Sequence, residues 1–505
     1  MNWARATTTI ADITEGWTVE DGPGGAIVLF DARRAHIEAA GGLADLSQER
    51  RFTPHTPIRL ASVSKQFLAS LMLGDVPVRL DHTLGQHLML EPALGAVPVS
   101  RALDMTGGLP DLIETLWLLG IAPSTSMSRH RLMDVAVRLD RLNFEPGTQI
   151  CYSNTGYRLV QAALLAHGVD YVTLLQEQLL RPLGLDFTFP EDASVPVRGL
   201  ATGYGRAPTG NWRAGRYGMH FSASGGMTGS AVDLARWGQA LLANQTPVAG
   251  LLEQLSAPRL LSNGRPTDYG LGLQRSEFDG RTLAGHGGSL PGYRSHILLD
   301  PVAQAGVVVL CNREDVDAGR LALELLADLH NVEPPKPADW LLPEGLFVAE
   351  SGPFWLHHHA GQVSFMGATE LVYDDDMTGI ARSRNAALPM QLRAADDGIV
   401  GEIGHVSRSF HPVPPRAPAN PIWAGSYAVH FAGGTMQVEV VISRGQARML
   451  MPPLGVALDL RPLDANRAVA QHSEGSWTQS FCASFENGQL HLASQRARTL
   501  TLNAV

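Results

Sequence analysis

Lysine is nearly absent from this chain of 505 residues. Of its 39 lysine and arginine residues, only Lys65 and Lys336 are lysine. Acidic residues outnumber basic ones, and the formal net charge is −10. A surface that binds duplex nucleic acid needs clustered basic side chains that face the phosphates, because the release of counterions drives that binding. The composition therefore argues against a nucleic-acid partner.

Cysteine and long apolar runs are also scarce. Cys151, Cys311 and Cys482 are widely spaced and odd in number, which indicates neither a disulfide framework nor a metal-binding knuckle. The chain has no run of about 18 apolar residues, and its start has no apolar segment behind a basic one. We therefore expect a cytoplasmic protein with reduced thiols and no membrane association.

Motifs for metals and nucleotides are missing as well. His357, His358 and His359 are consecutive, but successive residues of a strand point to opposite faces and do not converge on one ion. The chain contains no G-x-x-x-x-G-K-[ST] phosphate loop and no G-x-S-x-G nucleophile elbow. We expect neither a metal nor another cofactor.

The length predicts several domains. At roughly 150 residues per domain, the chain corresponds to about three domains, and its 45% of hydrophobic residues can supply their cores. Proline-rich joints at 331–340 and 411–421 interrupt regular structure. We therefore place the domains at residues 1–332, 338–412 and 420–505.

The first of these segments is typical of an α+β domain. Alternating apolar runs predict strands within 24–60 and again, in four short runs, within 268–312. Apolar residues at helical spacing predict helices at 62–74, 131–142, 155–167, 171–179, 231–243 and 316–329. We expect an antiparallel sheet flanked by helices.

The composition changes after residue 341. Long helical patterns give way to short alternating strands with glycine, Asp-Asp and Asn-Gly turns, which indicates small β-barrels or sandwiches. The two halves of this region open alike, with GLFVAESG at 345 and GSYAVHFAGG at 425. We infer two related β modules.

The rarity of lysine makes Lys65, in the segment ASVSKQF, unusual. Arginine does not release its proton in a protein, whereas a desolvated lysine can act as a base. Ser62 and Lys65 are three residues apart at the start of a predicted helix, which places both side chains on one face. A serine hydroxyl becomes a good nucleophile when a neighbouring base accepts its proton. The pair predicts a catalytic serine and its base, and the alternative is a surface lysine at a helix start.

Two later segments carry groups that such a serine needs. Tyr152 and Asn154 follow a Pro-Gly turn, and a tyrosine can pass the serine proton to a leaving group while an amide holds the substrate. In GHGGSLPG, which contains His286, the glycines allow a close approach of backbone to ligand. The N–H groups of Ser62 and Ser289 can then form an oxyanion hole. Taken singly, these patterns also fit a packed tyrosine and a glycine-rich hairpin.

The order of the three segments resembles that of the penicillin-recognising serine hydrolases of the class C β-lactamase type. Their boxes are S-x-x-K, Y-x-N and K-T-G or H-x-G, and here the third box runs from His286 to Gly288. The resemblance implies that Ser62 heads a helix between an all-α region and an antiparallel sheet. It also implies that Ser62, Lys65 and Tyr152 are catalytic and that Asn154 and the third box bind substrate.

Within that group the chain most resembles the D-aminopeptidases, in SVSKQF, in F-x-P-G before Y-x-N, in the HGG box and in the two trailing β modules. This resemblance implies two antiparallel, lipocalin-like barrels, a homodimer, and a loop of the last module that reaches the active site and restricts it to substrates with a free amino terminus. The expected activity is the release of an N-terminal D-residue through an acyl-enzyme. A neutral histidine in the third box attracts a substrate carboxylate less than a lysine does.

Three further positions are expected to bind the substrate amine. Gln274 lies where the resemblance predicts an asparagine, and Asp464 and Glu474 are the candidates for an acid on the loop of the last module. Either acid also fits a solvated turn residue. Two other functions stay open: an esterase, β-lactamase or D,D-peptidase of the same fold, and a binding or sensor protein that does not turn over its ligand.

Overall fold

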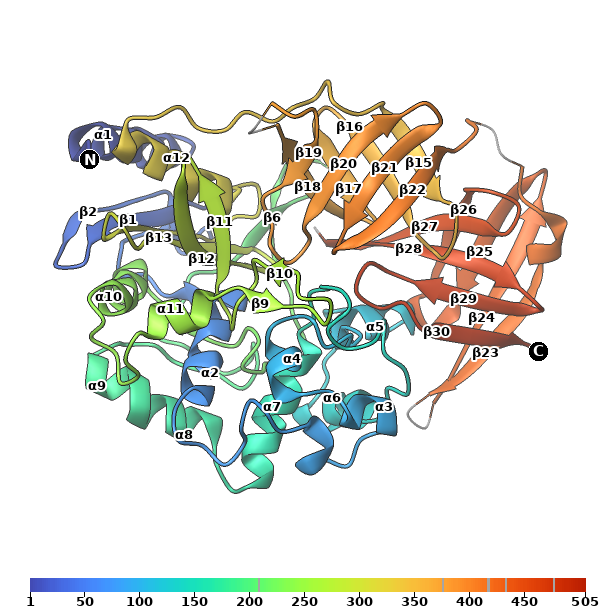
Figure 1. Cartoon of the computed structure of the whole chain (residues 1–505), viewed down its shortest axis with the longest axis horizontal. Coiled ribbons are helices and arrows are strands. Elements are labelled where there is room, and N and C mark those ends of the chain that lie inside the picture. The colour runs from blue at the N-terminus through green and yellow to red at the C-terminus, as the bar shows by residue number, and fades with distance from the viewer. Residues whose placement is uncertain (208, 375–376, 416–417, 432–433, 476) are drawn as a thin grey trace.

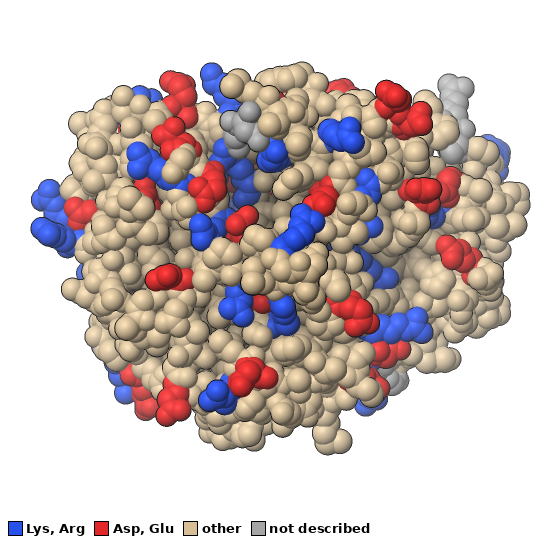
Figure 2. Space-filling model, in the orientation of Figure 1, with Lys and Arg blue, Asp and Glu red and all other residues tan. Residues whose placement is uncertain are grey.

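The computed structural model describes residues 1–207, 209–374, 377–415, 418–431, 434–475 and 477–505. An N-terminal domain of helices and strands is followed by two closed antiparallel barrels, which lie at the upper right and right of Figure 1. The predicted α+β fold with two trailing β-barrels is therefore confirmed. On the face of the molecule that Figure 2 shows, acidic and basic side chains are interspersed.

A six-stranded antiparallel sheet forms the centre of the N-terminal domain. It joins the two ends of that domain, because β1 pairs with β14 and places Ile27 opposite Val309. In spatial order its strands are β11 (Gln274–Phe278), β12 (Arg281–Leu290), β13 (Tyr293–Asp300), β14 (Ala305–Cys311), β1 (Gly25–Asp31) and β2 (Ala35–Gly41).

Both faces of the sheet are covered, so its central strands are apolar throughout. Side chains of a strand alternate between faces. In β1, Ile27 and Leu29 pack in one hydrophobic cluster with residues of α1 and α12, while Val28 and Phe30 pack in another with residues of α2 and α10. Figure 1 shows α1 and α12 on one side of the sheet and α10 and α2 on the other.

Most helices lie in the N-terminal domain. The α-helices are α1 (Trp3–Val19), α2 (Lys65–Met72), α3 (Pro92–Gly95), α4 (Val99–Leu103), α5 (Leu112–Leu118), α6 (Arg129–Ala136), α7 (Thr155–Ala166), α8 (Tyr171–Leu175), α9 (Arg181–Leu183), α10 (Ala231–Leu242), α11 (Leu251–Ser256) and α12 (Ala318–His330). The shorter turns are the 3₁₀ turns η1 (Ala61–Ser64), η2 (Leu84–Gln86), η4 (Pro421–Trp423) and η5 (Pro452–Leu454), and the π turn η3 (Gln176–Leu180).

Short strand pairs connect these elements. They are formed by β3 (Leu43–Asp45), β4 (Arg50–Arg51), β5 (Ile58–Arg59), β6 (Tyr204–Arg206), β7 (Trp212–Ala214), β8 (Thr228–Gly229), β9 (Arg259–Leu260) and β10 (Pro266–Thr267). The strand β5 precedes η1 in the chain. Its pairing with β8 helps to fix the start of α2.

Three details differ from the sequence prediction. The helix α1 was not predicted, because its run of three threonines has low helix propensity. The helix predicted over 131–142 ends at Ala136, where the last turn tightens and the Arg138 N–H donates to the Val135 carbonyl. The strand predicted from residue 268 begins at Gln274, because Gly272 has a φ of +81° that breaks the extended run.

Each barrel is a meander of eight strands that closes between its first and last strand. Closure removes the exposed sheet edges that an open meander leaves. The first barrel consists of β15 (Gly345–Ala349), β16 (Trp355–His359), β17 (Gln362–Phe365), β18 (Ala368–Tyr373), β19 (Ala381–Ser383), β20 (Met390–Ala395), β21 (Gly398–Ile403) and β22 (Val406–Pro412). The second consists of β23 (Gly425–Phe431), β24 (Gly434–Ser443), β25 (Gln446–Met451), β26 (Val456–Pro462), β27 (Arg467–Glu474), β28 (Trp477–Glu486), β29 (Gln489–Ala493) and β30 (Leu500–Ala504).

The second barrel packs against both of the other parts. Leu118 and Leu119, at the end of α5, belong to its hydrophobic cluster. Arg467 donates hydrogen bonds to the carbonyls of Ala349 and Gly352 in the first barrel, at 2.8 and 2.5 Å. The leucines thus join the second barrel to the N-terminal domain, and Arg467 joins it to the first barrel.

Two sequence features can be placed on this fold. In β16, His358 is buried while His357 and His359 are exposed, so the three histidines alternate as expected for a strand. Among the described residues, no group of three or more histidine, cysteine or acidic side chains is arranged to hold a metal ion. No helix within the described ranges is long and apolar enough to cross a bilayer.

The core of the second barrel depends on Trp423. It is fully buried, stacks on Phe485 with ring centroids 5.0 Å apart, and donates its indole N–H to the Ala465 carbonyl at 3.0 Å. We expect Trp423→Ala to lower the free energy of unfolding by about 3–5 kcal/mol, because it leaves a large cavity. Urea unfolding followed by far-UV circular dichroism measures this change.

The neighbouring residue supplies the control. Ile422 is 64% exposed, and we expect Ile422→Ala to change the free energy of unfolding by less than about 0.5 kcal/mol. Equal effects of the two substitutions would contradict the assignment of Trp423 to the core.

Candidate active site

Ser62 lies in η1, the 3₁₀ turn that leads into α2. The residue before it, Ala61, has a φ of +50°, a left-handed conformation that costs a residue other than glycine about 1–3 kcal/mol. Two hydrogen bonds hold this turn: the Ser64 hydroxyl donates to the Ala61 carbonyl at 2.6 Å, and the Ser295 hydroxyl donates to the Leu60 carbonyl at 2.7 Å. The strained turn orients Ser62 toward a cavity that it lines.

Lys65 is fully buried one turn after Ser62. Its Nζ lies 2.8 Å from Asn154 Oδ1, 2.7 Å from the Ser224 carbonyl oxygen and 3.1 Å from Ser62 Oγ. The first two atoms are acceptors only, so they take two N–H groups of the amine. If the amine is neutral, its lone pair is left to face the Ser62 hydroxyl.

The surroundings of Lys65 favour the neutral amine. Burial lowers the pKa of Lys65 well below its ordinary value, the charge of Asp111 opposes that change, and the charge of Arg496 adds to it. Removal from water disfavours the charged form of a lysine. The Ser62–Lys65 pair therefore has the geometry and the electrostatics of a hydroxyl beside its base.

Tyr152 lies beside Lys65. Its ring centroid is 4.7 Å from Lys65 Nζ, and its hydroxyl is buried. Burial raises the pKa of Tyr152 well above its ordinary value, and Ser62 and Arg496 lower it by smaller amounts. In the resting site Tyr152 is thus a protonated phenol with a proton to donate.

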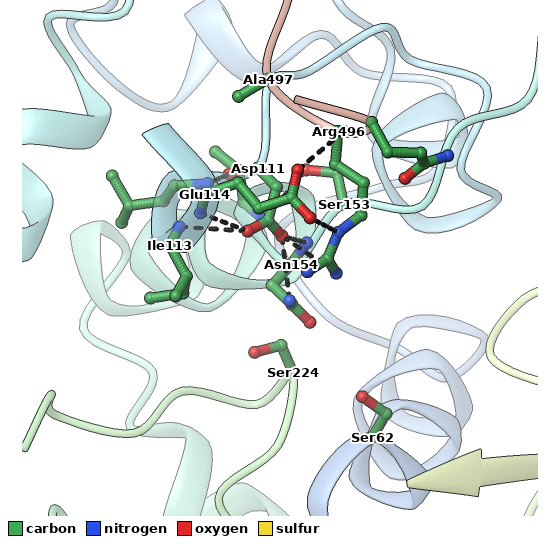
Figure 3. A network of polar contacts seen from close by, with 12 residues as sticks. Ser62, Asp111, Ile113, Glu114, Ser153, Asn154, Ser224, Arg496 and Ala497 are labelled. Carbon is green, nitrogen blue, oxygen red and sulfur yellow. Dashed lines mark hydrogen bonds and ion pairs between the residues drawn. The ribbon is translucent and has the colours of Figure 1, made fainter. Parts of the chain in front are cut away.

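Asn154 connects Lys65 to a buried carboxylate. Its backbone and side-chain N–H groups both donate to Asp111 Oδ2, at 2.9 Å each. Because a carboxylate only accepts, these bonds fix the amide with Oδ1 toward Lys65. Asp111 also caps α5 by accepting from the N–H groups of Ile113 and Glu114. Figure 3 shows Asn154 between Asp111 on one side and Ser62 and Ser224 on the other.

His286 lies on β12 in the wall of the same cavity. Its Nδ1 is 2.5 Å from the Gly287 carbonyl oxygen, which requires a hydrogen on Nδ1, and its Nε2 accepts from the Tyr269 hydroxyl at 2.9 Å. Burial, followed by the nearby Lys65, lowers the pKa of His286 to about 3. The third box therefore supplies a neutral imidazole.

The rest of the third box lies close to the turn that carries Ser62. A side chain at Gly288 would collide with the Leu60 carbonyl and the Ser295 hydroxyl, so glycine lets β12 approach the turn that carries Ser62. Ser289 is exposed and lines the cavity, as does Gln274 at the start of β11. Gln274 Oε1 accepts from the Ala386 N–H of the first barrel at 3.2 Å.

All three parts of the chain line this cavity, which has a volume of about 1190 Å³. Besides the N-terminal domain, the first barrel contributes Glu370, and the second contributes Trp477 and Arg496. The pKa of Glu370 is raised to about 7 by burial, although a hydrogen bond from Asn385 opposes that change. A loop of the last barrel thus reaches the cavity.

The two acids considered for that loop lie elsewhere. Asp464 pairs with Arg467, 2.6 Å away, where the barrels meet, and does not line the cavity. Glu474 accepts hydrogen bonds from the N–H and the hydroxyl of Ser124 and is not among the lining residues. The charged residue that the second barrel brings to the cavity is instead Arg496.

Sequence reasoning missed Asp111, Arg496 and Glu370. A signal for Asp111 was present, since an aspartate before the helical run LIETL is a typical helix cap. No pattern marks Arg496, because its partner Glu114 is 382 residues away in the sequence. Glu370 is an ordinary acidic residue of a predicted strand region, and no pattern marks it either.

A family model described as Beta-lactamase matches residues 10–331, more than half of the chain. The D-aminopeptidase of Brucella ovis is 28% identical over 347 residues, and the match covers 68% of this chain and 65% of that curated relative's length.

Two solved structures share the fold. One is an octameric penicillin-binding protein homologue from Pyrococcus abyssi, with 17% identity and a TM-score of 0.57 over 100% of both chains. The other is a D-amino acid amidase from Ochrobactrum anthropi SV3, with 22% identity and a TM-score of 0.53 over 65% of this chain and 99% of that chain. The resemblance inferred from the three boxes is confirmed, and the chain belongs to the beta-lactamase family.

Proposed function

We propose that this protein is a serine hydrolase and a D-stereospecific aminopeptidase, which releases an N-terminal D-residue from peptides, amides or esters through an acyl-enzyme at Ser62. The observation that carries the proposal is the buried Lys65 amine, 3.1 Å from Ser62 Oγ and hydrogen-bonded to two acceptors. A base in that place activates a serine hydroxyl.

The first half of the proposed reaction forms the acyl-enzyme. Ser62 Oγ attacks the substrate carbonyl carbon while its proton passes to Lys65. The N–H groups of Ser62 and Ser289 stabilise the oxyanion. Tyr152 donates its phenol proton to the leaving amine and is reprotonated by Lys65, so the bond to the amine breaks and an ester to Ser62 remains.

The second half returns the enzyme to its resting state. A water molecule gives a proton to Lys65 and attacks the ester, and the released Ser62 oxygen takes that proton back. Asn154 holds Lys65 in place in both halves through its 2.8 Å hydrogen bond. No cofactor takes part in this sequence.

Two observations support a substrate with a free amino terminus rather than a substrate carboxylate near the third box. The relatives include a protein named D-aminopeptidase. His286 is neutral because burial lowers its pKa to about 3, so it offers no positive charge to a carboxylate of a penicillin or a terminal D-alanine. The acid that binds the substrate amine is not Asp464 or Glu474 in this proposal, since neither lines the cavity.

The alternatives are an esterase, β-lactamase or D,D-peptidase of the same fold and a sensor that acylates without turnover. The homodimer implied by the resemblance and the cytoplasmic location stay predictions, and so does the absence of nucleic-acid and membrane partners.

Paired D- and L-alanine p-nitroanilides, each with a free and an acetylated amino group, test the function. We expect release of p-nitroaniline from the free D-compound at least about tenfold faster than from the other three, with Ser62→Ala as the inactive control. Faster hydrolysis of nitrocefin or simple esters would favour the first alternative. Release of one equivalent of product without further turnover would favour the sensor.

The role of Lys65 is tested by substitution. Lys65→Arg keeps a positive charge but removes the titratable amine, so we expect kcat to fall by about 10²–10⁴-fold, the usual contribution of a general base. Steady-state kinetics measures the loss, and Lys336→Arg at the exposed lysine is the matched control. An active Lys65→Arg enzyme would refute the base.

The ionisation of Lys65 can be observed directly, because the chain has two lysines. In protein labelled with ¹³C at lysine Cε, we expect one of two NMR signals to titrate well below the ordinary lysine pKa of about 10.4, and Lys336→Arg identifies it. Since the base works when deprotonated, a lowered pKa also moves the acid limb of kcat/KM to lower pH. A Lys65 signal that titrates at the ordinary value would exclude a neutral resting amine.

A further inference from the structure

The connection between β29 and β30 docks the second barrel onto the start of α5. Glu114 accepts three hydrogen bonds from it: from the Ser494 hydroxyl at 2.6 Å, from the Arg496 N–H at 2.8 Å and from Arg496 Nε at 2.6 Å. The Arg496 carbonyl in turn accepts from the Asp111 N–H at 2.9 Å. The backbone and the side chain of Arg496 are thus both fixed to the N-terminal domain.

The guanidinium of Arg496 lies among the groups that surround the nucleophile. Its Nη1 is 3.8 Å from Asp111 Oδ2, and its Cζ is 5.7 Å from the centre of the Tyr152 ring. Its side chain is 27% exposed, and the exposed part lines the cavity. Figure 3 shows Arg496 against Asp111 and Glu114, on the side of Asn154 away from Ser62.

A continuous chain of polar contacts therefore runs from the second barrel to the nucleophile. Arg496 is paired with Asp111, Asp111 accepts two hydrogen bonds from Asn154, and Asn154 Oδ1 accepts from Lys65. Lys65 Nζ ends the chain 3.1 Å from Ser62 Oγ. Each link has one arrangement of donor and acceptor, because the carboxylate only accepts and the guanidinium only donates.

We propose that Arg496 is a positioning residue of the reaction: by holding and neutralising Asp111 and Glu114, it keeps the Lys65 amine free to accept the Ser62 proton. The inference rests on the proposed function, since it assumes that Lys65 is the base. Through Arg496, the second barrel would then contribute to the active site.

Charge balance explains why a cation is needed at this place. The carboxylate of Asp111 lies near a lysine that has to lose its proton, and its negative charge favours the protonated amine. Arg496 compensates this charge and is among the causes that lower the pKa of Lys65 and of Tyr152. Asp111 stays ionised, because Arg496 and the hydrogen bonds from Asn154 and Glu114 outweigh the effect of burial and lower its pKa.

The other groups that face Lys65 carry no charge at neutral pH. They are the phenols of Tyr152 and Tyr157, whose ring centroids are 4.7 and 5.4 Å from Nζ, and the imidazole of His286. Burial raises the pKa of both tyrosines and lowers that of His286. The charged neighbours that can set the protonation of Lys65 are therefore Asp111 and Arg496.

The test removes the charge of Arg496 and measures the pKa of Lys65. In the ¹³C-lysine protein, we expect Arg496→Met to raise the pKa of Lys65 by about one pH unit, the size expected for a unit charge at roughly 8–10 Å in a partly buried site. The acid limb of kcat should move to higher pH by the same amount, and the rate of acylation below that limb should fall about tenfold. Arg496→Lys keeps the charge and should shift the pKa of Lys65 by less than half as much.

The control lies in the same loop. Arg498 donates to the Gln495 carbonyl and does not line the cavity, so Arg498→Met should leave the Lys65 signal and the acid limb unchanged. An equal effect of Arg498→Met would assign the change to loop docking and overturn the proposal. A rise in KM with unchanged kcat in Arg496→Met would overturn it too, because it would make Arg496 a substrate contact.

These measurements also distinguish a failure of the positioning role from a failure of the proposed function. The Lys65 titration needs no substrate. Two outcomes refute the positioning role whatever the substrate is: folded Arg496→Met has the wild-type pKa of Lys65, or Arg496→Lys and Arg496→Met shift that pKa equally. A wild-type enzyme that hydrolyses none of the D-alanine substrates refutes the proposed function alone.

Discussion

The site depends on one desolvated amine. Lys65 is fully buried, and a buried ammonium without a partner carboxylate in direct contact is costly, so the protein stabilises the neutral form and gives its two N–H groups to Asn154 and Ser224. The remaining direction of the amine then points to Ser62. The exclusion of water from Lys65 and the position of its two acceptors, Asn154 and Ser224, thus determine where the amine points.

The fold provides that exclusion. Lys65 lies in the fully buried helix α2, while the left-handed Ala61 and Gly288, which has no side chain, bring Ser62 and the strand β12 together. A rigid cluster of packed side chains keeps these groups in one arrangement, because interiors are close-packed and do not deform easily. The strain at Ala61 is tolerated since the hydrogen bonds around it are buried and satisfied.

Much of this could be read from the sequence. Ser62 and Lys65 are neighbours within one helical turn, and the strands, the glycine-rich box and the proline joints are local patterns that determine local structure. The change of composition after residue 341 predicted small barrels or sandwiches, the similar openings of its two halves predicted two modules, and the family resemblance predicted that both are barrels. Local patterns failed where long-range packing decided the outcome: α1 forms despite poor propensity because its apolar face packs on the sheet, and Arg496 meets Glu114 across 382 residues. Asp464 and Glu474 were candidates by residue type, but Asp464 pairs with Arg467 and Glu474 accepts a hydrogen bond from the Ser124 N–H.

The loop that carries Arg496 connects β29 to β30 in the second barrel, while the sheet needs β1 and β14 from opposite ends of the N-terminal domain. Synthesis proceeds from the amino end, and domains tend to fold in that order. A chain still on the ribosome can thus complete its sheet and enclose Lys65 well before the final barrel closes. The surroundings of Lys65 are then assembled in two stages, because Arg496 belongs to the second barrel and joins Asp111 after the sheet has formed. The complete set of polar contacts around Lys65 is in this way tied to the folding of the second barrel.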